Sequence, residues 1–191
     1  IGDRSAPKLE RTYTQDGGIL STRMIGSTLY LITQYTVTQD ENGTFIDYIP
    51  TTSEGEGGAK KLNAADIQIL PDAKTPNYLV VSALDTADAK KTVSRQAVLG
   101  SGNEVYCSTQ ALYTASTVYD DDVEYTTIFG FPFSQEGLGK SVSGRVRGHV
   151  LNQFSLDSYG GALRIATTET VNGSTSSRVT ICLLYTSDAA D

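Results

Sequence analysis

The most constraining feature of this 191-residue chain is a series of short runs of branched and aromatic residues, each followed by Gly, Asn or Asp. Branched and aromatic side chains fit the pleated surface of a strand, whereas glycine, asparagine and aspartate favour turns. Eighteen glycines and eleven tyrosines, with one methionine and no tryptophan, agree with this pattern. We therefore predict an all-β meander in a single domain. The expected strands span residues 27–37, 44–49, 77–84, 94–100, 103–108, 111–119, 124–133, 144–156 and 162–170.

Three stretches predict tight hairpins whose apolar residues pair across two strands. Their turns are expected at Gly26-Ser27, Thr109-Gln110 and Tyr159-Gly160. These registers stack apolar pairs on one face, as cross-strand pairing requires, and they point Cys107 at a core. The predicted partners are Met24 with Leu29, Cys107 with Leu112, Val105 with Thr114, Tyr106 with Tyr113, Leu156 with Leu163, and Phe154 with Ile165.

Related runs begin these second strands: "LYLIT" at 29, "YLVVS" at 78, "LYTAS" at 112 and "LRIAT" at 163. Their separations are 49, 34 and 51 residues, with a mean of about 45. A four-stranded propeller blade repeats every ~40–45 residues, so the runs suggest one per blade. A β-sandwich accommodates the same list of strands.

Residues 51–77 break this rhythm. Their first half is a Gly/Glu/Lys loop, and "LNAADIQIL" fits either one helical turn capped by Asn63 or a short strand ending at Pro71. We expect a loop or insertion over 51–77.

Charge and hydropathy exclude several classes of partner. A net charge of −7 and a pI near 4.7 disfavour nucleic acid, which is bound through clustered lysine and arginine. No apolar run approaches the ~20 residues that cross a bilayer, and the N-terminal residues lack the pattern of a signal peptide. We expect neither nucleic-acid binding nor a membrane span in this chain.

Three stretches carry a family resemblance: "LERTYTQDGGILSTRMIGSTLYLITQY", "YLVVSALDTADAKKTVSRQAVLGSGNEVYCSTQALYTAS" and "GHVLNQFSLDSYGGALRIATT". They resemble secreted bacterial and archaeal proteins with a C-terminal β-propeller domain distantly related to WD40 repeats. The resemblance implies a partial β-propeller of about three to four four-stranded antiparallel blades over residues 1–181. It also implies an extracellular or cell-envelope location, and it supplies no catalytic residues.

The two ends of the chain favour the interpretation of a fragment. "IGDRSAPKLERTY" resembles the end of one blade and the linker into the next, and "CLLYTSDAAD" (182–191) resembles a translated sequencing adapter. We therefore expect residues 182–191 to be a non-native tail. Cys107 and Cys182 could form a disulfide in an oxidising compartment, whereas a buried thiol is the simpler interpretation.

The acidic run "DDDVE" is the candidate metal site. Its carboxylates, Asp120, Asp121, Asp122 and Glu124, are hard oxygen ligands suited to Ca²⁺, although the run lacks the alternating spacing of a dedicated calcium loop. A solvated loop is the alternative, and we expect no other cofactor. "SQEGLGKS" (134–141) approaches a phosphate-binding loop but has Ser134 at the first glycine position and a strand pattern after it.

Three charged residues have predicted structural roles. Arg23 and Arg164 fall on the faces of the hairpins opposite the apolar pairs, with Arg164 across from Ser155 and Asp157 diagonal to it. We interpret Asp157 and Arg164 as an ion pair that braces a blade. His149 is the only histidine, so no site built from several histidines is available.

These observations favour a non-enzymatic module of the cell surface that binds a protein or a glycan. The alternative is part of an extracellular propeller enzyme, such as a hydrolase, whose catalytic residues lie largely in other blades. Fold alone does not decide between them, because function belongs to the site.

Overall fold

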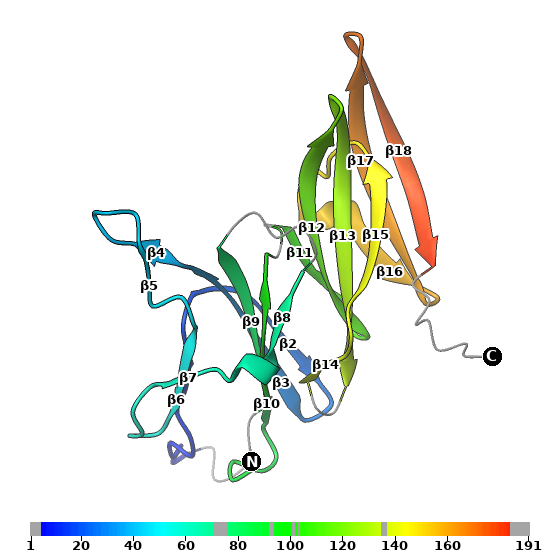
Figure 1. Ribbon diagram of the computed structural model, residues 1–191. Coiled ribbons are helices and arrows are strands. Elements are labelled where there is room, and N and C mark those ends of the chain that lie inside the picture. The colour runs from blue at the N-terminus through cyan, green and yellow to red at the C-terminus, as the bar shows by residue number, and fades with distance from the viewer. Residues whose placement is uncertain are drawn as a thin grey trace, which may run out of the picture. The chain divides into compact units, whose positions relative to one another are not determined.

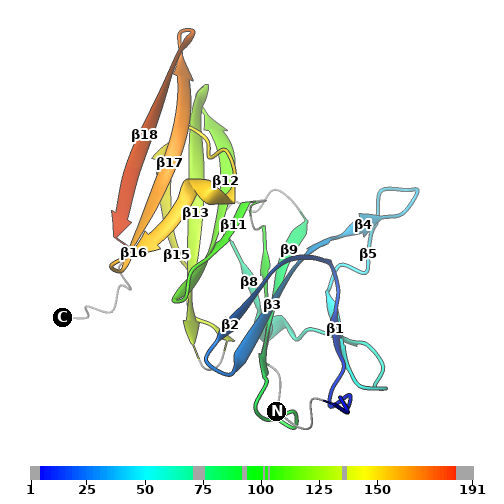
Figure 2. The same ribbon diagram turned by 180° about the vertical axis from the view of Figure 1, so that it is seen from behind.

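The computed structural model describes residues 5–70, 76–91, 94–100, 102, 104–134 and 137–183. The chain divides into two compact units, residues 1–100 and 101–191. Strands dominate both units (Figures 1 and 2), and the helical elements of the described residues are two three-residue 3₁₀ turns. The prediction of an all-β chain is confirmed.

The first unit is built on a four-stranded antiparallel meander, β2-β3-β9-β10, to which β8 adds in parallel beside β10. Met24 pairs with Leu29 as predicted. A buried cluster that includes Tyr78, Val80 and Ala97 supports the meander. The elements of this unit are β1 (Tyr13–Gln15), β2 (Gly18–Ile25), β3 (Thr28–Thr36), β4 (Thr38–Gln39), β5 (Phe45–Ile46), β6 (Thr51–Glu54), β7 (Lys60–Lys61), η1 (Ala64–Asp66), β8 (Ile67–Ile69), β9 (Asn77–Asp85) and β10 (Ser94–Leu99).

Residues 37–76 form an insertion between two neighbouring strands of this meander. β3 and β9 pair continuously from Thr28 opposite Asp85 to Thr36 opposite Asn77, although the insertion separates them in sequence. It contains the β4–β5 hairpin, and it contains β6, which pairs with both β1 and β7.

The expectation of a plain loop in the first half of 51–77 is therefore wrong, since β6 and β7 form there. Both alternatives for "LNAADIQIL" occur in succession, as η1 and then β8. Asn63 precedes η1, but its side chain donates to an Asp66 carboxylate oxygen at 3.2 Å and makes no cap hydrogen bond. Pro71 lies outside the described residues.

The second unit contains two antiparallel sheets. The first, β11-β12-β13-β15, is a four-stranded meander with the short β14 at the end of β13, and the second is β16-β17-β18. Its elements are β11 (Glu104–Cys107), β12 (Ala111–Asp120), β13 (Val123–Ser134), β14 (Gly137–Leu138), β15 (Val142–Arg147), η2 (Gln153–Ser155), β16 (Leu156–Tyr159), β17 (Ala162–Val171) and β18 (Ser174–Leu183).

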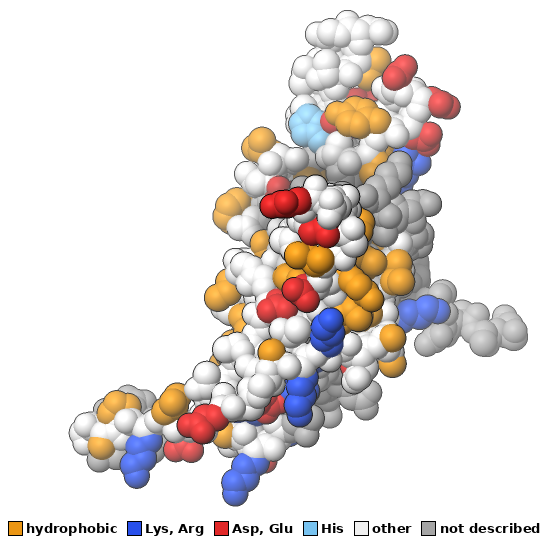
Figure 3. Space-filling view, turned by 60° about the vertical axis from the view of Figure 1, so that its left-hand side comes forward, with side chains coloured by type: hydrophobic (Ala, Val, Ile, Leu, Met, Phe, Trp, Pro, Cys, Tyr) orange, Lys and Arg blue, Asp and Glu red, His pale blue; other side chains and the backbone are white. Residues whose placement is uncertain are grey.

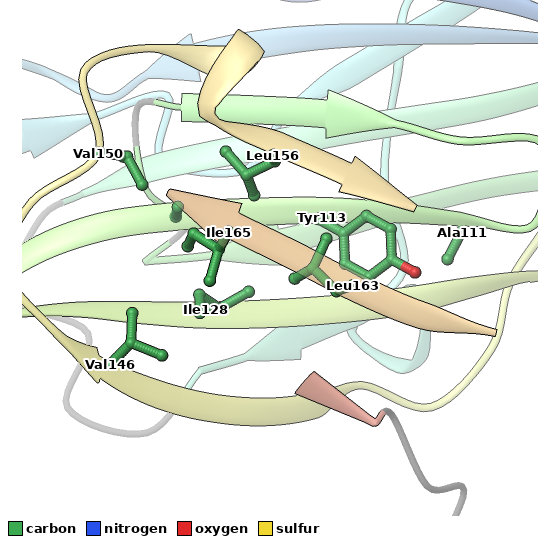
Figure 4. Packing of buried hydrophobic residues seen from close by; sticks show 9 residues of the cluster. Ala111, Tyr113, Ile128, Val146, Val150, Leu156, Leu163 and Ile165 are labelled. Carbon is green, nitrogen blue, oxygen red and sulfur yellow. The ribbon is translucent and has the colours of Figure 1, made fainter. Parts of the chain in front are cut away.

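A shared core joins these two sheets (Figure 4). Tyr113 and Ile128 of the first sheet pack with Leu156, Leu163 and Ile165 of the second, and the last two are fully buried. Alternation along each strand explains this, because every second side chain points to the same face. The core therefore lies between sheet faces, as expected for neighbouring blades.

The hairpin formed by β11 and β12 has the predicted register. Cys107 pairs with Leu112, Val105 with Thr114, and Tyr106 with Tyr113, whose rings stack at 5.8 Å between centroids. Cys107 is buried, which confirms the buried-thiol interpretation for this residue. Cys107 and Cys182 are not bonded to each other, and Cys182 lies on β18 opposite Leu163. Most of the expected tail, residues 184–191, lies outside the described residues.

The single strand expected over 144–156 is wrong, because the chain leaves β15 after Arg147. Gly148 has a φ of 82°, which ends the extended conformation. Asn152 then accepts a hydrogen bond from the Phe154 N–H at 2.9 Å and starts η2. The predicted strand is thereby divided between two sheets.

The predicted register of the β16–β17 hairpin is displaced by two residues. Leu156 pairs with Ile165 instead of Leu163, and Phe154 lies in η2 with 86% of its surface exposed. The turn consists of Gly160-Gly161, with φ values of 60° and 79°. A turn centred one residue earlier would place Tyr159 at a positive φ, which a bulky residue disfavours. The apolar face is unchanged, because a displacement of two residues preserves the face.

The suggestion that the four related runs occur once per blade is also corrected. "LYLIT", "LYTAS" and "LRIAT" begin β3, β12 and β17, each the second strand of its sheet. "YLVVS" belongs to β9, which is the third strand of the same meander as β3. The three runs that begin a second strand thus mark two four-stranded meanders and the three-stranded β16-β17-β18 sheet, and the insertion explains the uneven spacing.

Candidate functional site

The acidic run 120–124 forms a hairpin turn between β12 and β13. Asp121 and Asp122 occupy the turn with φ values of 47° and 62°. Asp120 pairs with Val123 and Tyr119 with Glu124, so Asp120 and Glu124 lie on opposite faces of the ladder. Among the described residues, no group of three or more His, Cys, Asp or Glu side chains is placed to hold a metal ion. Asp120 and Glu124 therefore do not face one ion.

The Asp120 carboxylate has a protein partner on its own face. Arg145 of β15 donates to it at 3.0 Å, and the guanidinium carbon of Arg145 lies 3.8 Å from the centroid of the Tyr125 ring. This arrangement combines an ion pair with a cation–π contact across three strands, β12, β13 and β15. It fixes Arg145 beside the turn.

A second cluster, on the opposite face, was missed by sequence reasoning. The Nδ1 atom of His149 lies 2.7 Å from a Glu124 carboxylate oxygen, and the Tyr119 hydroxyl donates to the other oxygen at 2.9 Å. The hydrogen bond from His149 holds the pKa of Glu124 below its usual value, whereas the bond to Glu124 raises the pKa of Tyr119. The histidine side chain is partly open to solvent, and Figure 3 shows acidic side chains close to it.

Strand pairing brings His149 and Glu124 together although they are far apart in sequence. The β13–β15 ladder ends with Tyr125 opposite Arg147. The next residue after Arg147, Gly148, therefore lies beside Glu124, the residue before Tyr125. The Gly148 N–H donates to the Glu124 carbonyl at 2.8 Å, and the buried Thr126 hydroxyl donates to the Gly148 carbonyl at 2.7 Å. The sequence gives no local signal for the contact between His149 and Glu124, because it depends on the pairing of β13 with β15.

The same segment connects the two sheets of the second unit. His149 and Thr168 of β17 exchange two backbone hydrogen bonds, each of 2.9 Å. A Cβ atom on Gly148 would lie only 2.5 Å from the Thr168 carbonyl oxygen. Glycine is required at this close approach, and the Tyr119–Glu124–His149 cluster braces the joint.

The predicted ion pair between Asp157 and Arg164 is present. The two residues are direct cross-strand partners, which corrects the expected diagonal relation and the placement of Arg164 opposite Ser155. The Arg164 guanidinium also lies over the ring of Tyr159, 5.0 Å from its centroid. Because both side chains are about half exposed, this pair contributes little to stability and remains accessible.

Arg23 differs from this arrangement. It lies opposite Tyr30, is exposed, and donates to the carbonyl of the adjacent Thr22 at 3.0 Å. The ion pairs of the described residues do not include it. Its predicted role as a structural brace is not supported by this geometry.

Large hydrophobic side chains are exposed on the segment that links the two sheets and at the end of β16. Leu151, Phe154 and Tyr159 are 80%, 86% and 73% exposed. The Asn152 side chain holds the backbone at Phe154, and the Arg164 guanidinium contacts Tyr159. We call Phe154, Asp157, Tyr159 and Arg164 the aromatic-ionic surface.

The phosphate-loop-like segment continues as strand. β13 ends at Ser134, β14 covers Gly137–Leu138, and the next element described is β15. The helix that such a loop requires is replaced by these strands, in agreement with the sequence interpretation. No helix in the described residues has the length and apolarity needed to span a membrane.

Comparison with known proteins identifies the family. No curated protein and no solved structure gave a significant match. The family model described as "Beta propeller domain" matches residues 1–190. This match spans nearly the whole chain and agrees with the succession of antiparallel meanders. The chain therefore belongs to the β-propeller domain family.

Proposed function

We propose that this β-propeller domain is a non-enzymatic binding module that acts outside the cell or at the cell envelope of a bacterium or archaeon. Its partner is a protein or a glycan of that surface. The proposal extends the family assignment by the resemblance to secreted prokaryotic propeller proteins and by the aromatic-ionic surface.

The observation that carries the proposal is the exposure of two aromatic rings on a well-braced segment. Phe154 and Tyr159 present most of their surface to solvent, while Asn152 and Arg164 restrain their surroundings. Aromatic side chains supply large contact areas at binding surfaces at a small cost in conformational entropy, and arginine is enriched beside them in binding hot spots. A neighbouring carboxylate, Asp157, adds a hydrogen-bond acceptor suited to sugar hydroxyls or backbone amides.

Binding measurements with matched variants test the proposal. The labelled chain is applied to a glycan array and, separately, to envelope proteins of prokaryotic cells, and bound partners are quantified. The Phe154→Ala/Tyr159→Ala double variant should lose most of this binding. Tyr48→Ala is the control, because Tyr48 is an exposed tyrosine of the first unit, 57% accessible.

Two results would contradict the proposal. Equal binding by the wild type and the double variant would exclude the aromatic-ionic surface. Retention of the full-length protein in the cytoplasm, measured by cell fractionation, would exclude the envelope location.

A further inference from the structure

We propose that Asn172, at the tip of the β17–β18 hairpin, undergoes spontaneous deamidation, and that the fold protects Asn42 although both belong to Asn-Gly-Ser/Thr sequences. The Gly173 backbone nitrogen attacks the side-chain amide carbon of Asn172 and forms a cyclic succinimide. The bond from that carbon to the amide nitrogen breaks, and ammonia leaves with the proton of the Gly173 N–H. Water then opens the ring at either carbonyl, which yields aspartate or isoaspartate.

The hairpin leaves the reacting groups of Asn172 accessible. Asn172 and Gly173 form a two-residue turn between the paired residues Val171 and Ser174, with φ values of 50° and 77°. Both turn residues are exposed. Within the part of the chain that the structure describes, no hydrogen bond holds the Gly173 N–H or the Asn172 amide. Neither the nucleophile nor its target is therefore held by a hydrogen bond in the described structure.

The equivalent groups at Asn42 are restrained by one aspartate. The Gly43 N–H donates to the Asp40 carbonyl at 3.0 Å, so this nitrogen must lose a hydrogen bond before it can attack. The Asp40 carboxylate accepts from the Asn42 and Thr44 N–H groups at 2.9 and 2.8 Å. Its negative charge also disfavours loss of a proton from the nearby Gly43 nitrogen. The same dipeptide is consequently protected at one hairpin and unprotected at the other.

Deamidation would alter the hairpin that carries it. Aspartate adds a negative charge at the tip, and isoaspartate adds a methylene group to the backbone of a two-residue turn. Two-residue turns match the twist of their flanking strands only with defined backbone angles. The pairs beside the turn, including the Thr170–Thr175 hydroxyl contact of 3.1 Å, would be the first to separate.

The test follows both asparagines in the same molecules. The wild-type chain is incubated at mildly alkaline pH in water labelled with heavy oxygen, then digested with trypsin. Fragment 165–178 contains Asn172 and fragment 24–60 contains Asn42, and mass spectrometry measures oxygen incorporation in each. In the folded chain, Asn172 should react roughly three- to tenfold faster, the factor expected when one ordinary hydrogen bond protects Asn42. In denaturant the two rates should converge.

An Asn172→Gly variant is the control for the assignment. The Gly160-Gly161 turn of the same unit shows that two glycines adopt positive φ values in such a hairpin. The variant should lose the signal in fragment 165–178 and keep the Asn42 rate unchanged. The proposal is overturned if Asn42 reacts as fast as Asn172 in the folded chain, if Asn172 stays intact there, or if the rate difference persists in denaturant.

Discussion

Replacing Gly148 by alanine tests the joint between the two sheets of the second unit. At a φ of 82°, any residue other than glycine costs ~1–2 kcal/mol. The new Cβ would also lie 2.5 Å from the Thr168 carbonyl oxygen, so the backbone must separate there. Separation weakens the two 2.9 Å hydrogen bonds between His149 and Thr168, each contributing ~0.5–1.5 kcal/mol. We expect a total loss of about 2–5 kcal/mol in the free energy of unfolding.

Gly161→Ala is the matched control, because Gly161 has nearly the same φ, 79°, and a Cβ atom added to it would meet no other atom within 4 Å. It should cost only the ~1–2 kcal/mol of the backbone conformation. Urea unfolding followed by far-UV circular dichroism measures both values, and amide exchange at Thr168 reports on the joint itself. Equal losses in the two variants, or unchanged exchange at Thr168 in Gly148→Ala, would refute the close-approach argument.

Three further predictions concern the second unit. Leu163→Ala should cost about 2–5 kcal/mol of unfolding free energy because Leu163 is fully buried, whereas Val179→Ala at a 70% exposed position should stay within about 0.5 kcal/mol, both measured by urea unfolding. Because the pKa of Glu124 is lowered in the folded chain, its contribution is present above the unfolded pKa of about 4.3 and is lost as pH falls through the folded value. Glu124→Gln should therefore flatten the decline in stability as the pH falls below about 4.3, and an unchanged decline would contradict the His149 contact. Burial raises the pKa of the Cys182 thiol, so a thiol reagent at neutral pH should label Cys182 more slowly in the folded chain than it labels Cys182 in the urea-unfolded chain.

Local patterns predicted the strands well where turn chemistry and burial agreed. The register from Cys107 to Leu112 follows from alternating apolar residues about a short turn, and the structure has it. The predicted register of the hairpin at 156–165 was displaced because the expected turn used Tyr159, although Gly160-Gly161 is the pair in this stretch that adopts two positive φ values without strain. Its buried face was nevertheless correct, since side chains repeat every two residues.

Features that depend on pairing between distant segments were not predictable in this way. The contact between Glu124 and His149 depends on the β13–β15 ladder, and the place of "YLVVS" in the first meander depends on pairing across an insertion. The ion pair of Asp157 and Arg164 was found because both lie in one hairpin. Sequence reasoning thus reached the aromatic-ionic surface in part, while the brace at His149 required the fold.

The insertion at residues 37–76 has a consequence for how such chains diversify. β3 and β9 keep a continuous ladder on either side of it, so the meander tolerates a long excursion at this connection. The entropy of closing a loop grows only with the logarithm of its length, and doubling a flexible loop costs about 0.6 kcal/mol. The β4–β5 hairpin is therefore the permissive part of this connection, where a segment can be lengthened or fused to a reporter, whereas β6 and β8 pair with strands outside the insertion and must be kept.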